Sequence, residues 1–329
     1  MRDSISVRTT FLRLRQSLRL HHWAKNALVF VPLVLGGKAD DATAWGTVLI
    51  GFFALGFVVS ATYIMNDIWD LPNDRNHRSK RYRPLASGDL SIRTGLLAAA
   101  ASLVIGLTLA RYSGSPWAAT GLAIYVVVTL AYSYALKRVP ILDVLVLAAL
   151  FTFRLVYGIL LADVQLSFWL LVFSMFMFLS LSLAKRHTDI VLLADEGLQR
   201  VQGRGYRLAD GPLILSLGVS SAVAAIVVLV DYLLEDAFPR QFYSDPVWLW
   251  TIPPIVFLFL GRIWLAAQRG ELHDDPITFA LKDPFSLWLG VLLILVLVVA
   301  VFGFVPLSRF ASADEGVSSW LLHHRITAR

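Results

Sequence analysis

Three aspartates whose spacing suits a metal site stand at the end of a long apolar stretch of the chain. Asp67, Asp70 and Asp74 are three and four residues apart, so on a continuous helix their carboxylates would line one face. Oxygen ligands of this kind suit Mg²⁺, which takes one or two carboxylates and fills its octahedron with water and substrate phosphate. Pro72 disfavours helical geometry at Leu71. We therefore expect Asp74 in a loop beyond the helix end, as a supporting ligand.

Basic residues follow these acids directly. Arginine suits phosphate oxygens, although bases at a membrane edge also orient a protein or bind anionic lipids. Acids and bases side by side are what a Mg²⁺–diphosphate requires, and the plain alternative is a solvated helix end with internal ion pairs. The candidates from this stretch are Asn66, Lys80, Arg81 and Arg83.

Further charged residues are candidates for the same chamber. Lys185 and Arg186, with Asp189 behind them, form a second basic group that could grip phosphates. Asp143 and Arg154 lie 11 residues apart in an otherwise apolar stretch, where they could line the chamber or pair with other helices. The remaining candidates, each of which could also be an ordinary interfacial side chain, are Lys25, Asn26, Tyr132 and Lys137.

Two other stretches carry weaker signals. Asp274 and Asp275 are adjacent, and adjacent helical residues point about 100° apart, so we expect a structured loop or lid there and no second metal site. The stretch QGRGYR (202–207) could cradle a phosphate with its backbone amides, but it lacks the lysine pattern of a nucleotide-binding loop. We expect His21, His22 and His273 to lie at the membrane interface.

The composition places these residues in a membrane protein. The chain of 329 residues is 57% hydrophobic and only 16% charged, against about 25% charged in soluble domains, and its mean hydropathy is +0.67. We interpret the net charge of +6 as the orienting charge of a bilayer protein, not as a nucleic-acid surface. Cysteine is absent, which excludes disulfides and thiolate ligands. The basic N-terminus lacks the pattern of a cleavable signal peptide.

Nine apolar stretches could cross about 30 Å of hydrocarbon, which takes about 20 residues each. We predict one all-α integral membrane domain over residues 1–329, with a nine-helix bundle from about 24 to 306 and a non-cytoplasmic tail at 307–329. The first stretch is short and contains Pro32. The nine stretches are 24–37, 43–65, 93–111, 117–136, 140–161, 165–184, 211–232, 246–267 and 285–306.

The distribution of Lys and Arg predicts the orientation. If the N-terminus is cytoplasmic, 22 of the 29 Lys and Arg residues fall on the cytoplasmic side and six on the other, as the positive-inside rule requires. The candidate metal and phosphate residues then face the cytoplasm from the inner membrane. A transporter would instead be expected to show internal repeats, and the sequence has no convincing repeat.

The pattern Asn66-Asp67-x-x-Asp70-x-x-x-Asp74 in a multi-span chain resembles the first aspartate-rich motif of the UbiA superfamily of intramembrane prenyltransferases. The resemblance covers about residues 10–305 and is nearest to the decaprenyl-phosphate phosphoribosyltransferase branch. It implies a nine-helix bundle and a Mg²⁺-dependent transferase. Besides that motif, it rests on the stretches SLRLHHWAKNALVFVPLVLGGK (17–38), YSYALKRVPILDVLVL (132–147), LSLAKRHTDI (181–190) and GRGYRLAD (203–210).

The residues at the position of the second motif distinguish two enzyme activities within this family. Ordinary members carry a second aspartate-rich motif there, whereas this chain reads Lys185-Arg186-His187-Thr188-Asp189. One acid and two bases hold less metal and more phosphate, so the resemblance implies transfer of 5-phosphoribosyl from phosphoribosyl pyrophosphate to a polyprenyl phosphate for cell-envelope synthesis. Asp67, Asp70, Lys185 and Arg186 would be catalytic. The alternative, which shares the first motif, is transfer of an isoprenoid from a prenyl diphosphate to an aromatic acceptor.

Overall fold

The computed structural model describes residues 12–76, 80–195, 197–201, 203–240, 242–272 and 275–303. Most of the described residues are helical, and the only bridge of β type among them joins Arg200 to Arg207. His77, His273, Asp274 and the predicted tail 307–329 lie outside the described residues. The longer helices are α3 (Ala42–Trp69), α6 (Ile92–Arg111), α7 (Ala118–Tyr134), α8 (Leu142–Ala162), α9 (Phe168–Asp195), α10 (Gly211–Tyr232), α11 (Ile252–Gln268) and α13 (Pro284–Phe302).

Short elements connect these helices and cluster at their ends. Four of them are α-helices: α2 (Val31–Leu35), α4 (Leu71–Asn76), α5 (Pro84–Ser87) and α12 (Pro276–Ala280). The 3₁₀-helices are η1 (Leu20–Phe30), η2 (Lys80–Tyr82), η3 (Leu136–Arg138), η4 (Leu208–Asp210) and η6 (Pro246–Thr251), and η5 (Leu233–Ala237) is a π-helix.

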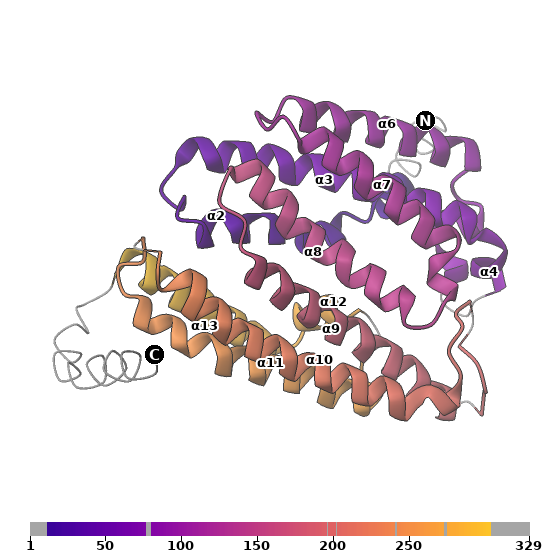
Figure 1. The fold of residues 1–329 in the computed structure, drawn as a ribbon. Helices are drawn as coiled ribbons and strands as arrows, with labels where there is room; N and C mark the ends of the chain where they lie inside the picture. Colours follow the sequence, from indigo (N-terminus) through magenta and orange to yellow (C-terminus); the bar gives the residue numbers. More distant parts are fainter. Residues whose placement is uncertain are drawn as a thin grey trace.

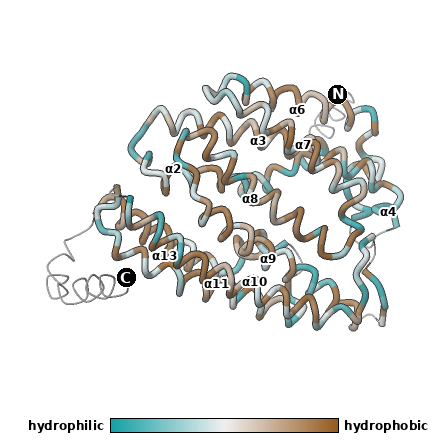
Figure 2. Tube along the Cα trace, viewed as in Figure 1, coloured by the Kyte–Doolittle hydropathy of each residue, from teal (hydrophilic) through white to brown (hydrophobic). Residues whose placement is uncertain are grey.

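The long helices form a bundle of two groups that meet at α8 and α9 (Figure 1). One apolar core lies between η1, α2, α3, α7 and α8, and a second joins α8 and α9 to the helices that follow. Hydrophilic residues gather at the end of the bundle that holds α4 and the 203–207 loop (Figure 2). A polar functional site is therefore expected at this end of the bundle.

Seven helices are long and apolar enough to cross a membrane, so the chain is a multi-pass membrane protein. They are Ala42–Trp69, Ile92–Arg111, Leu142–Ala162, Phe168–Ala194, Leu208–Ala237, Pro246–Gln268 and Pro284–Phe302. An eighth predicted span, 117–136, forms the apolar but shorter helix α7, of 17 residues. The prediction of nine spanning helices is therefore borne out for seven by length and hydropathy.

The first predicted span, 24–37, differs from the expectation of one α-helix. It is formed by the 3₁₀-helix η1 followed by α2, and Pro32 stands in the first turn of α2, where a missing N–H is tolerated. A 3₁₀-helix rises about 2.0 Å per residue and an α-helix about 1.5 Å, so residues 20–35 extend for about 30 Å. The segment packs closely on α8, where Gly158 faces the backbone of Val29.

We expect Gly158→Ala to lower the thermal stability of the protein in detergent. A Cβ at this position would overlap the carbonyl oxygen of Val29, and overpacking of a tight contact costs about 1–3 kcal/mol. Gly261→Ala in α11 is the matched control, because among the described residues nothing outside its own helix lies within 4 Å of its Cβ position. Alanine is favoured over glycine by about 1 kcal/mol in a helix, so this control should not be destabilised. Equal melting temperatures for the two variants would contradict the close approach of η1 to α8.

Candidate active site

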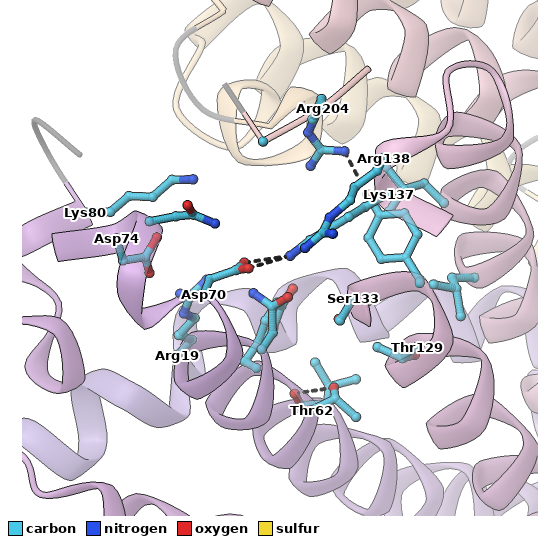
Figure 3. Close-up of a pocket in the computed structure, with 18 of the residues that line it drawn as sticks. Arg19, Thr62, Asp70, Asp74, Lys80, Thr129, Ser133, Lys137, Arg138 and Arg204 are labelled. Atoms are coloured by element: carbon cyan, nitrogen blue, oxygen red, sulfur yellow. Dashed lines mark hydrogen bonds and ion pairs between the residues drawn. The ribbon is translucent and has the colours of Figure 1, made fainter. Parts of the chain in front are cut away.

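A cavity of about 440 Å³ opens at the polar end of the bundle, between α3, α7 and α8 (Figure 3). Two carboxylates line it, Asp70 and Asp74. Eight cationic side chains also line it, so the cavity carries a large excess of positive charge and is suited to an anionic ligand. These eight are Arg19, Lys25, Lys80, Arg83, Lys137, Arg138, Arg154 and Arg204.

A break in the helix sets the directions of the aspartates. Helix α3 ends at Trp69, Asp70 is its C-cap residue, and α4 begins at Leu71. The structure corrects the expectation that Asp74 lies in a loop, because Asp74 is in α4 and only 2% exposed. Pro72 is tolerated because it stands in the first turn of the new helix, where no backbone N–H is needed.

Asp70 and Asp74 each face the cavity and each pair with a base. The ammonium of Lys137 donates to both carboxylate oxygens of Asp70, at 2.7 and 2.8 Å. Arg83 donates to Asp74 at 2.6 Å. Both carboxylates are thus held in place from one side, with lining residues Asn66 and Asn73 nearby.

Asp67 lies apart from the other two carboxylates and does not line the cavity. It is only 4% exposed and accepts two hydrogen bonds from Arg19, at 2.6 and 2.8 Å. The same nitrogen of Arg83 that binds Asp74 also donates to Asp67, at 3.0 Å. Asp67 therefore orients the two arginines, and the predicted single face of three carboxylates is divided at the helix break.

The donor set fits a Mg²⁺ ion that shares its coordination with substrate. Among the residues that the structure describes, no group of three or more acidic or histidine side chains is close enough to hold a metal alone. Mg²⁺ commonly uses only one or two carboxylates and takes the rest of its ligands from water and phosphate. Asp70 and Asp74 supply these two carboxylates at one wall of the cavity.

The second basic motif lies on α9, behind the cavity wall. Lys185 donates to the backbone carbonyl of Leu272 at 3.0 Å and pairs with Asp189 at 3.2 Å. Arg186 is 6% exposed and pairs with Asp189 at 2.6 Å and with Asp143 at 3.2 Å. None of these three motif residues lines the cavity. Arg186 is connected to the cavity indirectly, because its partner Asp143 also pairs with the lining residue Arg204.

Asp143 is the centre of a buried cluster that positions Arg204. Its side chain is fully buried, pairs with Arg186, and accepts hydrogen bonds from Arg204 at 3.0 Å and from the hydroxyl of Tyr206. Burial and the carboxylate raise the pKa of Tyr206, so its hydroxyl stays protonated as a donor. Arg204 also donates to Tyr132 at 3.1 Å and lines the cavity. The structure therefore places Asp143 in the wall and Arg204 at the cavity surface.

Two glycines allow the 203–207 loop to pack closely against the backbone at Arg138. Gly203 has a left-handed backbone conformation with φ of +74°, which favours glycine. A Cβ on Gly205 would lie 2.6 Å from the backbone oxygen of Arg138. The glycine-rich segment 203–207 thus brings Arg204 to the site.

The floor of the cavity is formed by Arg154 in the middle of α8. Arg154 is 4% exposed and donates to the side chains of Asn26 and Tyr125, both at 3.2 Å. An arginine at the centre of a membrane helix costs about 2.5–3.5 kcal/mol on insertion scales and marks a functional site. Asn26 is completely buried on η1.

Three further predicted residues have different surroundings. Lys80 lines the cavity with an exposed side chain, and partial desolvation there together with the neighbouring Arg83 lowers its pKa. Lys25 lines it as well and pairs at 2.8 Å with Asp275, the N-cap residue of α12. Arg81 is exposed, stacks over Tyr82 at 4.8 Å from the ring centre and does not line the cavity.

A comparison with known families identifies the fold and the enzyme class. Residues 27–290 match the model of the UbiA prenyltransferase family. The chain belongs to the UbiA prenyltransferase family. Its fold agrees with that of a UbiA homologue from Archaeoglobus fulgidus solved with GPP and Mg²⁺, at a TM-score of 0.64 and 15% identity, over 87% of this chain and 96% of that one.

Curated proteins that are similar to this chain carry different names. An uncharacterized protein y4nM of Sinorhizobium fredii is 45% identical over 84% of this chain, but this chain spans only 53% of its length. The nodulation protein NoeC of Azorhizobium caulinodans is 31% identical over 86% of this chain and 91% of the relative. The decaprenyl-phosphate phosphoribosyltransferase of Mycolicibacterium smegmatis is 32% identical, over 84% and 89% respectively.

Some cavity residues of this UbiA-family chain were not singled out from the sequence as site candidates. Arg19 and Arg138 read as orienting charges of the kind common at membrane edges, and Arg204 was part of a weak glycine-rich signal. Tyr125 is one aromatic residue within an apolar helix. The glycines on both sides of Arg204 were the only local indication that its backbone approaches another element closely.

Proposed function

We propose that this enzyme transfers the 5-phosphoribosyl group of phosphoribosyl pyrophosphate to a polyprenyl phosphate, with Mg²⁺, and releases pyrophosphate. The main observation that supports the proposal is that eight cationic side chains and only two carboxylates line the cavity. Phosphoribosyl pyrophosphate brings a diphosphate and a separate phosphate, and the lipid acceptor brings another phosphate. Three anionic groups need more cations than one prenyl diphosphate does.

Asp70 and Asp74 would hold the Mg²⁺ ion, with Asp67 supporting them through Arg83. When bound, the metal would neutralise the charge that develops on the leaving pyrophosphate. Lys137 and Arg83 pair with the two carboxylates at 2.7 and 2.6 Å, so both bases stand where they can move onto diphosphate oxygens. Lys80 and Arg204 lie at the same mouth of the cavity (Figure 3).

The chemistry needs positioning more than proton transfer. A phosphate oxygen of the lipid acceptor forms a bond to C1 of the ribose. The bond from C1 to the pyrophosphate oxygen breaks, and its electron pair leaves with pyrophosphate. The sugar passes through an oxocarbenium-like state, as in other glycosyl transfers. A phosphate monoester has its second pKa at about 6, so the acceptor is largely ionised at neutral pH and needs no strong base.

The relatives support this donor only in part. The relatives from Corynebacterium glutamicum and Mycolicibacterium smegmatis carry the name decaprenyl-phosphate phosphoribosyltransferase, and this agrees with the basic lining. We further propose that the cavity faces the cytoplasm, since the bases at the α4 end follow the positive-inside rule. The product would be a lipid-linked pentose phosphate for cell-envelope synthesis.

The second candidate function is transfer of an isoprenoid from a prenyl diphosphate. It is favoured by the apolar part of the lining, which includes Val59, Leu147, Leu150 and Phe151 and could accept a short prenyl chain. It is disfavoured by Arg154 at the floor, because a prenyl chain brings no charge to match that guanidinium.

The two candidates are separated by an assay with purified protein. We expect label from phosphoribosyl pyrophosphate to enter the lipid fraction when Mg²⁺ and polyprenyl phosphate are present, and chelation of Mg²⁺ to abolish the transfer. Omission of the lipid is the control for hydrolysis of the donor. If no label enters the lipid while a prenyl diphosphate reacts with an aromatic acid, the prenyltransferase function is correct.

A further inference from the structure

Arg154 differs from five of the seven other cavity cations in its partners, and from the exposed Arg138 in being buried. Five of the others are paired with carboxylates: Arg19 with Asp67, Lys25 with Asp275, Arg83 with Asp67 and Asp74, Lys137 with Asp70, and Arg204 with Asp143. Arg154 contacts only neutral groups, and no carboxylate of the described residues pairs with it. A buried charge of this kind is normally compensated, which makes Arg154 a candidate contact for an anionic ligand.

The guanidinium of Arg154 keeps donors available for such a ligand. Its hydrogen bonds go to Asn26, Tyr125 and the carbonyl of Leu150, while an arginine has five N–H groups. It also lies over the ring of Phe151, at 4.8 Å from the ring centre. The contacts fix its position without neutralising its charge.

Asn26 adds a second unsatisfied donor at the same place. The side chain is completely buried, and its oxygen accepts from Arg154. Its amide nitrogen has no hydrogen-bond partner among the described residues. Buried amides are nearly always paired, so Asn26 leaves a further buried donor next to Arg154, although Asn26 does not itself line the cavity.

The position of Arg154 separates it from the carboxylates at the mouth. Arg154 lies 12 residues into α8 after Leu142, which is about 18 Å along the helix axis. Along α7, Thr129 and Ser133 line the cavity between Tyr125, which contacts Arg154, and Lys137, which pairs with Asp70. The cavity therefore has a cationic end with carboxylates, a hydroxyl-lined middle and a cationic end without carboxylates.

We infer that Arg154 and Tyr125, with Asn26 holding the guanidinium of Arg154, form a floor subsite that binds a phosphate monoester. The inference rests on the proposed function and deepens it: the mouth would take the Mg²⁺-bound diphosphate, the hydroxyls would face the ribose, and the floor would take the donor's 5-phosphate. The phosphate of the lipid acceptor has the same chemistry and is the other source. A phosphate matches the planar guanidinium through paired hydrogen bonds.

The test compares ligands that reach one end or both ends of the cavity. In Arg154→Gln, binding of phosphoribosyl pyrophosphate should weaken about tenfold or more, the loss of one charge-assisted contact, while binding of Mg²⁺–pyrophosphate should stay unchanged. Asn26→Asp supplies an internal carboxylate beside Arg154. It should weaken phosphoribosyl pyrophosphate similarly and leave the unliganded protein at least as thermally stable, so misfolding cannot explain the loss.

Arg262→Gln is the matched control, because Arg262 pairs with Asp283 outside the cavity. If Arg154→Gln instead weakens only polyprenyl phosphate, the subsite holds the acceptor's phosphate. If neither variant weakens either ligand, the floor subsite is refuted. If the wild-type protein neither binds nor transfers phosphoribosyl, the proposed function fails by itself. Inorganic phosphate added with saturating Mg²⁺–pyrophosphate then decides the subsite, since it should stabilise the wild type and not Arg154→Gln.

Discussion

Asp70→Asn is expected to remove nearly all turnover while the protein stays folded in the membrane. Loss of an outer contact of a metal ligand costs about 10–100-fold in affinity or activity, so loss of a ligand itself should cost more than about 100-fold. Asparagine keeps the shape of the side chain but not the charge that faces Lys137 at 2.7 Å and would hold Mg²⁺. The measurement is the initial rate of phosphoribosyl transfer over a series of Mg²⁺ concentrations.

Asp163→Asn is the control for this variant. Asp163 is exposed at the far end of α8 and has a left-handed conformation with φ of +51°, which asparagine also adopts readily. It should keep wild-type rates and an unchanged Mg²⁺ dependence. Full activity of Asp70→Asn in a correctly inserted protein would rule out Asp70 as a metal ligand.

Asp143→Asn is expected to give the largest loss of stability. The carboxylate is fully buried and pairs with Arg186 at 3.2 Å and Arg204 at 3.0 Å. Removal of one partner of a buried ion pair costs about 3–5 kcal/mol, because the remaining charge is left uncompensated. The 203–207 loop should also loosen, so any folded variant should show a raised KM for phosphoribosyl pyrophosphate. Thermal unfolding and steady-state kinetics measure the two effects.

The double variant Asp143→Asn/Arg204→Gln isolates the charge effect. It removes one of the two uncompensated cations, so it should be more stable than Asp143→Asn alone, while Arg204→Gln alone should raise the same KM. A melting temperature that does not change in Asp143→Asn would show that Asp143 is not the electrostatic centre of the buried cluster. A KM that does not change in any of the three would exclude Arg204 from substrate binding.

The sequence by itself determined the all-helical membrane fold, because hydropathy and span length depend only on local composition. It also placed the polar chemistry near Asp70, since the motif and the bases after it are contiguous along the chain. It predicted Arg154 as a chamber residue because an ionisable group within an apolar helix is costly and therefore functional. Most of the long apolar helices lie within a few residues of their predicted bounds, but α9 continues to Asp195, well beyond the predicted end at 184, so the second motif is helical.

Only the tertiary structure decided how the charged residues are divided among roles. The spacing of Asp67, Asp70 and Asp74 suggested one face, but the break at Asp70 turns Asp67 toward Arg19 and leaves the other two at the cavity. Arg186, a predicted phosphate ligand, is turned to Asp143 behind the wall. Ion pairs between residues far apart in sequence decide these directions, because a carboxylate or guanidinium that is taken out of water must find its partner wherever helix packing brings one.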